Sequence, residues 1–272
     1  MQKTLNLIKA KQEQKSQILK LLEQSPYENL FIIADINEFG LQSDIVATYV
    51  KFKDQQLKSV YYVYYENLLI FDPYSLIEDK ELKWLIDQYK IKNIITFSQS
   101  NLHTANLIKN NNIEYQLKNE NMLILDKLND ALENNQNLAY LADESEIENI
   151  IESRKQIKEF SGLGNQSYDL DHQKQIYKSG FYIPFVIKEN NQIVSHASTS
   201  CLTKNSAMIG GVFTLKEHRN KSYAKMCMLK LIKYLVQNNI KPILFYDNPI
   251  AGKVYKDLGF IDYSQIYVYI LN

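Results

Sequence analysis

The sequence AMIGGVFT at residues 207–214 and the sequence RNKSYA at residues 219–224 decide the fold of this chain. The first is an apolar run that reads as a strand, and a strongly apolar helix is expected from Tyr223 to Val236. A turn that opens a helix presents unpaired main-chain N–H groups and the positive end of the helix dipole. We therefore predict a strand–turn–helix unit whose turn can bind an anion such as a diphosphate.

A second strand–helix unit follows it. Residues 243–246 read as a strand, and residues 250–258 read as a helix that Asn248 caps and Pro249 begins. Ala251 and Tyr255 are four residues apart and share one helix face, and Gly259 suits the helix end. A plain helix start also explains Asn248 and Pro249.

These two units together resemble the GNAT superfamily of acyl-CoA-dependent N-acyltransferases. The family pattern Arg/Gln-x-x-Gly-x-Gly/Ala is matched by Arg219-x-x-Ser222-x-Ala224, in which a serine replaces one family glycine. The resemblance implies acetyl-CoA as co-substrate and Tyr255 as the general acid. It also implies that the co-substrate contacts Val212, Phe213, Thr214, Arg219, Asn220, Lys221, Ser222, Tyr223, Ala224, Asn248, Ala251 and Tyr255.

Both halves of the chain give the same order of predicted elements. In the first half we expect strands at 4–8, 45–52, 59–65, 68–71, 94–97, 113–117 and 122–125, and helices at 13–23, 27–38, 76–89 and 102–109. In the second we expect strands at 138–141, 182–187, 193–199, 207–214 and 243–246, two strands ending at 271, and helices at 145–160, 169–177, 223–236 and 250–258. This order predicts an α/β (α+β) fold of two tandem GNAT-like domains, each a mixed, mostly antiparallel sheet flanked by helices.

We expect the boundary in the polar stretch 126–137, which gives a degenerate GNAT-like domain at 1–130 and an N-acetyltransferase domain at 138–272. One continuous α/β domain is the alternative. The first domain lacks the basic loop, because Asp72, Glu78 and Asp79 lie at the corresponding helix start and repel phosphate. Ile108 stands near the position that corresponds to Tyr255. We therefore expect the first domain to have a structural role or to shape the acceptor pocket.

Composition narrows the function classes. Lys and Arg together number 31, as do Asp and Glu, so the net charge is zero and no nucleic-acid or membrane partner is expected. There is no signal-peptide core, and no apolar run is long enough to span a bilayer, so we expect a cytoplasmic protein. Cys227 lies in an apolar helix and is expected to be a buried thiol. We expect no metal site, a small-molecule amine as acceptor, and a chain that can form a homodimer.

The resemblance implies direct transfer of an acetyl group from acetyl-CoA to an amine. The general base is open, since Met208 stands where many relatives have Glu. The candidate bases are Glu159, Glu217, His196 and His218, with water as a further choice. Two other functions stay open: a non-catalytic CoA-binding or interaction module, and a peptidoglycan aminoacyltransferase, a family that also uses tandem GNAT-like domains.

Overall fold

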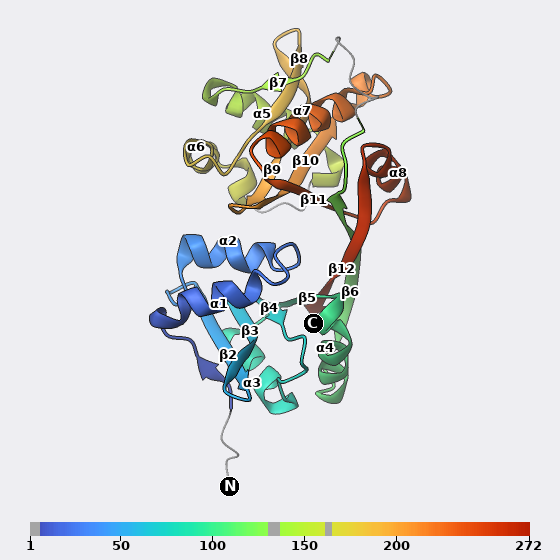
Figure 1. The fold of residues 1–272 in the computed structure, drawn as a ribbon. Coiled ribbons are helices and arrows are strands. Elements are labelled where there is room, and N and C mark those ends of the chain that lie inside the picture. The colour runs from blue at the N-terminus through green and yellow to red at the C-terminus, as the bar shows by residue number, and fades with distance from the viewer. Residues whose placement is uncertain (1–5, 130–136, 161–164) are drawn as a thin grey trace. The chain divides into compact units, whose positions relative to one another are not determined.

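The computed structural model describes residues 6–129, 137–160 and 165–272 and divides into two compact units. Unit 1 comprises Met1–Met122 and Asp262–Asn272, and unit 2 comprises Leu123–Ile261. Each unit holds a sheet with helices packed against it, and Figure 1 shows their elements. The α/β class and the tandem arrangement expected from the sequence are confirmed.

In unit 1 the strand order is β1-β2-β3-β4-β5-β12. The helices α1 and α2 bury Ile18 and Ile36 against Val60 and Tyr62 on one face of this sheet. The other face carries Tyr61 and Val63 and is covered by α3 and α4, as strand alternation requires. The elements are β1 (Ile8–Lys9), η1 (Gln12–Gln14), α1 (Lys15–Leu22), α2 (Leu30–Phe39), β2 (Val46–Lys53), β3 (Gln56–Tyr64), β4 (Asn67–Phe71), α3 (Asp79–Tyr89), β5 (Asn93–Phe97) and α4 (Ser98–Asn110).

In unit 2 the strand order is β11-β10-β9-β8-β7. The long helix α7 packs Cys227, Leu231 and Leu235 into the main core, so Cys227 is the buried thiol that its sequence context predicts. Ile150 of α5 joins a smaller cluster with Val186. The elements are β7 (Tyr140–Leu141), η3 (Glu144–Glu146), α5 (Ile147–Lys155), η4 (Lys158–Phe160), η5 (Asn165–Tyr168), α6 (Leu170–Lys178), β8 (Phe185–Glu189), β9 (Gln192–Leu202), β10 (Ser206–Thr214), η6 (Lys216–His218), α7 (Tyr223–Gln237), β11 (Lys241–Tyr246) and α8 (Pro249–Asp257).

The closing strands differ from the sequence prediction. Each half was expected to end in two short strands, but each ends in a single long one, β6 (Tyr115–Leu125) and β12 (Phe260–Leu271). The polar residues 118–121 and 262–265 suggest a break between strands, yet the backbone stays extended through both segments. In β6 the side chains from Tyr115 to Glu120 are exposed, so the strand lacks the buried face on which the alternation pattern depends.

Both long strands cross the division between the units. Residues 262–271 of β12 belong to unit 1, where Ile266–Ile270 pair antiparallel with Asn93–Phe97 of β5. Residues 123–125 of β6 belong to unit 2, where Leu123 and Leu125 lie in the main core. The division expected at 126–137 cuts the chain once, whereas unit 1 combines an N-terminal segment with the C-terminal residues 262–272. Part of that division, residues 130–136, lies outside the described residues.

Several helix ends also differ from the predicted bounds, among them the start of α4, which lies at Ser98 where 102 was expected. The helix expected at 76–89 begins at Asp79, because a capping box of Glu78 and Glu81 fixes its start there. The helix expected at 145–160 ends at Lys155 and is followed by the separate turn η4.

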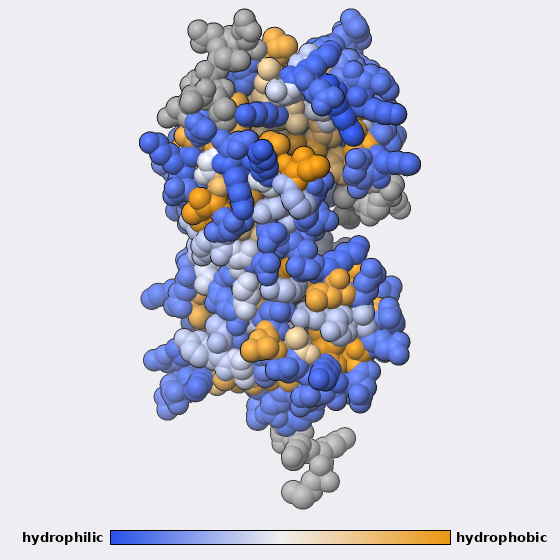
Figure 2. Space-filling model, turned by 90° about the vertical axis from the view of Figure 1, so that its right-hand side faces the viewer, coloured by the Kyte–Doolittle hydropathy of each residue, from blue (hydrophilic) through white to orange (hydrophobic). Residues whose placement is uncertain are grey.

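The face shown in Figure 2 is mostly hydrophilic, with hydrophobic patches scattered over it. Large apolar side chains that face solvent include Leu102 of α4 and Ile250 of α8, and single residues of this kind are normal on protein surfaces. In the part of the chain that the structure describes, no helix has the length and apolar character to cross a membrane. Nor do the described residues hold a cluster of three His, Cys, Asp or Glu side chains suited to a metal.

Candidate functional site

The sheet of unit 2 opens between two parallel strands. Strands β10 and β11 pair only from Ser206↔Lys241 to Met208↔Ile243, although β10 continues to Thr214 and β11 to Tyr246. Unit 1 shows the closed counterpart, because its parallel pair β4 and β5 stays in register from Asn67 to Ile70, almost to the end of β4. The opening in unit 2 leaves main-chain groups of β10 beyond Met208 without a ladder partner on β11.

A bulge lies in β10 beside this opening. The register with β9 shifts between Gly210 and Phe213, so neither Gly211 nor Val212 has a paired residue on β9. Gly211 has a φ of +59°, a conformation that glycine adopts without steric cost. A Cβ atom at Gly211 would lie 3.1 Å from Cε1 of His196. Bulges of this kind re-aim main-chain groups and occur next to active sites.

The loop after β10 leads into the N-terminus of α7. Ser222 is the N-cap of α7 and has a φ of +60° and ψ of 18°, and Asn220 has a φ of +65°. Ser222 thus takes the left-handed conformation that the family glycine takes more cheaply. Successive N–H groups in such a turn form a concave anion site at the positive end of the helix. The first turn of α7 contains no acidic residue.

Charged side chains surround this loop. Glu189, at the end of β8, accepts a hydrogen bond from the Tyr223 hydroxyl, lies 3.0 Å from Nδ1 of His218 and forms an ion pair with Lys221 at 3.7 Å. The Tyr223 hydroxyl, with Lys221 and His218, lowers the pKa of Glu189. Arg219 donates through Nε to the Thr214 carbonyl at 3.1 Å, which ties the loop to the end of β10. The loop therefore presents two exposed cations, with one carboxylate tethering it.

Helix α8 carries the candidate general acid. Asn248 caps the helix by accepting a hydrogen bond from the Ile250 N–H at 2.9 Å, so its side-chain oxygen already serves the local structure. Tyr255 is half-buried, its ring meets Tyr246 edge to face at 6.3 Å, and burial raises the pKa of its phenol. Among the described residues, none forms a hydrogen bond with the Tyr255 hydroxyl. The phenol is thus protonated at neutral pH and has a free proton to donate.

The role of Gly252 was not predicted from the sequence. A Cβ atom at Gly252 would lie 2.2 Å from the ring of Tyr246, so only glycine lets this ring lie against α8. Tyr246 in turn packs on Tyr255. Gly252 lies three residues, about one helical turn, before Tyr255. This spacing is the signal in the sequence that could have indicated its role.

The four candidate bases lie in different environments. His196 has no exposed surface, and both ring nitrogens have partners, Tyr182 at Nε2 and Gly211 at Nδ1. Burial lowers its pKa to about 3, with a contribution from the Arg154 charge, so His196 is not a base at neutral pH. His218 is paired with Glu189.

The two carboxylates among the candidate bases are exposed to solvent. Glu159 is exposed and lies 3.7 Å from Arg219, and Glu217 is exposed in η6. Met208, at the position where a base was sought, is half-buried on β10 where the ladder with β11 ends. None of these side chains makes a geometry that singles it out as the base.

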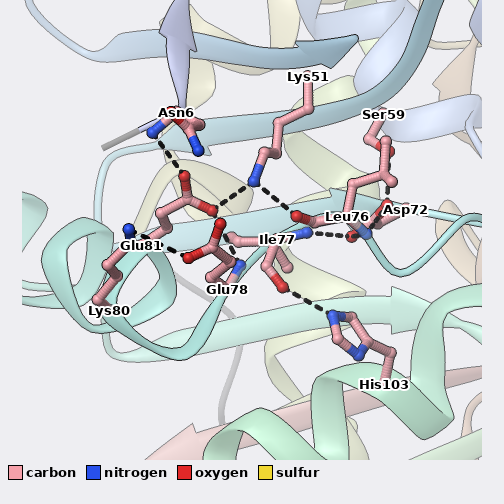
Figure 3. Close-up of polar contacts among 10 residues, drawn as sticks. All are labelled: Asn6, Lys51, Ser59, Asp72, Leu76, Ile77, Glu78, Lys80, Glu81 and His103. Carbon is pink, nitrogen blue, oxygen red and sulfur yellow. Dashed lines mark hydrogen bonds and ion pairs between the residues drawn. The ribbon is translucent and has the colours of Figure 1, made fainter. Parts of the chain in front are cut away.

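Unit 1 fills the corresponding loop with its own carboxylate. Figure 3 shows Asp72, which follows β4, accepting hydrogen bonds from the N–H groups of Leu76 and Ile77 at 2.8 and 2.9 Å. The Ser59 hydroxyl donates to the same carboxylate at 2.5 Å, and Asp72 is almost completely buried. The main-chain N–H groups that would meet a bound anion are thus already satisfied.

A buried ion pair closes this region further. Lys51 lies 2.6 Å from both Glu81 and the Leu76 carbonyl, and Glu81 also accepts from the N–H groups of Asn6 and Glu78 (Figure 3). Ile108, near the position that corresponds to Tyr255, is fully buried in the core. The loop of unit 1 is therefore built as a permanent internal structure.

Unit 2 thus places the sequence-predicted residues on three adjoining elements. Val212, Phe213 and Thr214 lie on the bulged end of β10, and residues 219–224 form the loop and the first residues of α7. Ala251 and Tyr255 lie on α8 and Asn248 is its N-cap; this helix follows β11 on the other side of the opening. Phe213 is the exception within the first group, because its side chain is buried and stacks on His196 at 5.3 Å.

Comparisons with known proteins agree with this architecture. A family model described as GNAT acetyltransferase matches residues 75–269. A GCN5-related N-acetyltransferase from Sphaerobacter thermophilus superposes with a TM-score of 0.67 at 12% identity, over 98% of this chain and 96% of that one. A GNAT-family acetyltransferase from Colwellia psychrerythraea gives a TM-score of 0.62 at 14% identity, over 98% and 99%. No curated protein matches the chain.

The tandem architecture has a solved counterpart as well. A tandem GNAT protein from the clavulanic acid biosynthesis pathway superposes with a TM-score of 0.61 at 10% identity, over 98% of both chains. At such identities the structural matches show the fold alone. The family model covers more than half of the sequence, from α3 to β12, and so the chain belongs to the GNAT acetyltransferase family.

Proposed function

We propose that this protein is an N-acetyltransferase that moves the acetyl group of acetyl-CoA to the amine of a small molecule, at a single site in unit 2. The observation that carries the proposal is the early end of the β10–β11 ladder at Met208 and Ile243. Beyond this point β10 has no ladder partner on β11, and the chain after β10 forms a loop with positive φ angles at the start of α7.

The residues present fit an acyl-CoA. The loop offers main-chain N–H groups and the helix dipole for the diphosphate, with Lys221 and Arg219 as exposed cations beside it. The opening along Val212 offers unpaired strand edge to the amide-bearing pantetheine arm, as a sheet edge accepts an added strand. Glu189 is the unfavourable element, because its carboxylate would lie near the diphosphate and compete for Lys221.

When bound, acetyl-CoA supplies an activated acetyl group on a thioester. The amine nitrogen attacks the thioester carbon, the new C–N bond replaces the C–S bond, and the amine loses one proton. A fixed N–H donor beside the bulge would stabilise the negative charge that develops on the thioester oxygen, an effect worth about 3 kcal/mol. Tyr255 would give its proton to the departing thiolate.

No described side chain is singled out as base, so we propose that water carries the proton from the amine to solvent. The acceptor is a small molecule rather than nucleic acid, because a chain with zero net charge has no general attraction to a polyanion.

Replacing Tyr255 with Phe tests the assignment. The variant keeps the ring that packs on Tyr246, so its fold and its affinity for acetyl-CoA should stay unchanged within about twofold. Turnover at saturating acetyl-CoA, followed by the released thiol with a panel of amines, should fall by about 100-fold, within the range for loss of a general acid. Tyr234→Phe on α7 is the matched control.

Unchanged turnover in Tyr255→Phe would remove the general-acid role. Binding of acetyl-CoA without turnover by the unaltered protein would instead favour the non-catalytic CoA-binding module.

A further inference from the structure

A chain of buried polar side chains ends at the bulge of β10. Arg154 of α5 donates through Nη2 to the Tyr182 hydroxyl at 3.2 Å, which lies 2.9 Å from Nε2 of His196. Nδ1 of His196 lies 2.6 Å from the Gly211 carbonyl oxygen. All three side chains are more than nine-tenths buried. None of these hydrogen bonds involves the loop at residues 219–224.

The direction of every bond in this chain is determined. A guanidinium can only donate, so the Tyr182 oxygen accepts from Arg154; because the neutral ring of His196 carries its one proton on Nδ1, its Nε2 accepts the proton of the Tyr182 hydroxyl. A carbonyl can only accept, so the ring proton of His196 is on Nδ1. Burial and the charge of Arg154 keep the ring neutral, with a pKa of about 3. The imidazole is therefore locked as one tautomer that donates to Gly211.

In the part of the chain that the structure describes, no carboxylate pairs with the buried Arg154. Its partners there are the Ser167 carbonyl and the Tyr182 hydroxyl. A buried charge without an opposite charge costs stability. What Arg154 does in return is to orient Tyr182 and hence the ring of His196.

The locked ring fixes one peptide of the bulge. A trans peptide holds its C=O and N–H on opposite sides of the chain. Because the Gly211 oxygen points at His196, the N–H of Val212 points away from it. Gly211 and Val212 have no paired residue on β9, and pairing with β11 ends at Met208. The ring of His196 is thus the contact that sets the orientation of this peptide.

Building on the proposed acetyl transfer, we infer that Arg154, Tyr182 and His196 are positioning residues that aim the Val212 N–H at the thioester carbonyl. They touch neither the acetyl group nor the amine and act through the Gly211–Val212 peptide. Removing a fixed donor of this kind costs about 100- to 1000-fold in kcat, and misdirecting one costs less, so we expect about 10- to 100-fold.

Two substitutions of His196 separate positioning from packing. His196→Asn places its amide nitrogen where Nδ1 was and keeps the donor to Gly211. His196→Gln reaches the position of Nε2, keeps a partner for Tyr182 and loses the donor to Gly211. Gln also fills more of the ring's volume, so a side chain that only packs the core would tolerate Gln at least as well as Asn.

The main readout is the carbonyl stretch of carbonyl-13C-labelled acetyl-CoA bound to each variant, measured by infrared difference spectroscopy. A hydrogen bond polarises the carbonyl and lowers its frequency. The unaltered protein and His196→Asn should show this lowering, and His196→Gln should lose it. Values of kcat with the best amine of the panel should fall in the order unaltered, Asn, Gln, while the Kd for acetyl-CoA changes by less than threefold.

A measurement on the free, unaltered protein covers the case in which a variant does not fold. Nitrogen-15 NMR of the histidine side chains should show His196 with its proton on Nδ1 and no titration down to pH 4. A proton on Nε2, or equal carbonyl bands in the Asn and Gln variants, would overturn the inference. If the unaltered protein does not bind acetyl-CoA, the proposed function itself fails, and the NMR result still stands for the tautomer.

Discussion

At the scale of single residues, two positions show how backbone conformation decides the site. Ser222 and Gly211 both have positive φ angles, of +60° and +59°. The sequence identified Ser222 as a replacement of a family glycine, and the structure shows that serine adopts the glycine-like conformation. The close approach of an imidazole to Gly211 could not be read from the sequence, because His196 comes from another strand.

The environment of His196 could not be predicted, for a similar reason. A histidine in an alternating strand can face solvent or the core, and the sequence left it among four candidate bases. Its partners Tyr182 and Arg154 are 14 and 42 residues away in the chain. Only the fold brings the three together.

The buried ring makes stability depend on pH in a predictable way. The pKa of His196 is lowered from 6.5 to about 3, so below pH 6.5 the unfolded chain binds a proton that the folded chain does not. This contribution to stability is present above pH 6.5 and is lost as the pH falls toward 3. Each pH unit in that window removes up to about 1.4 kcal/mol from the free energy of unfolding.

His196→Asn lacks this titration while it keeps the other groups, including Arg154 and Tyr182. We therefore expect the stability gap between the unaltered protein and His196→Asn, measured by urea unfolding at pH 7.5, 6 and 5, to narrow as the pH falls. A gap that stays constant over this range would show that His196 is not buried as a neutral ring.

At the scale of elements, the difference between the units lies in one pair of parallel strands and the loop after it. The acids at 72, 78 and 79 led to the prediction that the first loop is unsuited to phosphate. That Asp72 itself occupies the main-chain N–H groups was not readable, since it depends on Ser59 and on the path of residues 73–78. Strand-by-strand reading also gave no sign of where the β10–β11 ladder ends.

Asp72 should therefore be the main stabilising residue of the first loop. Asp72→Ala leaves the N–H groups of Leu76 and Ile77 buried without a partner and should lower the free energy of unfolding by about 3 kcal/mol or more. Asp72→Asn keeps an oxygen acceptor and should cost less. Urea unfolding measures both, and Asp87→Ala, on the exposed face of α3, should change stability by less than about 0.5 kcal/mol.

If Asp72→Ala lowers the free energy of unfolding by no more than Asp87→Ala does, the Asp72 carboxylate does not stabilise this loop as we propose.

At the scale of the whole molecule, the order of elements could be predicted from the sequence, but the unit to which the last strand belongs could not. Both halves follow the same order, and this repetition was visible from periodicity and turn signals. The pairing of β12 with β5 is a contact between residues about 170 positions apart, for example Tyr267 with Thr96. Ile266 and Tyr269 show only that one face of the strand is buried. Their apolar character does not say in which unit they pack.

Deleting residues 262–272 tests which unit owns this strand. The deletion removes the partner of β5 and the buried Tyr269, so hydrogen exchange should accelerate in β2 to β5 of unit 1. Exchange in β8 to β10 and α7 should stay slow. Loss of protection in α7 and β10, with unit 1 unchanged, would return the strand to the second domain as the sequence division at 138–272 has it.

The central claim is that one acetyl-CoA binds per chain, at the start of α7. Isothermal titration calorimetry with the unaltered protein, Ala224→Glu and Gln237→Glu tests it most directly. Ala224→Glu adds bulk and negative charge in the first turn of α7, and Gln237→Glu adds the same charge at the exposed far end of that helix. We predict one site per chain, a loss of affinity of at least about tenfold in Ala224→Glu, equal to 1.4 kcal/mol, and no change in Gln237→Glu. Two sites per chain, no binding, or an unchanged affinity in Ala224→Glu would contradict the account.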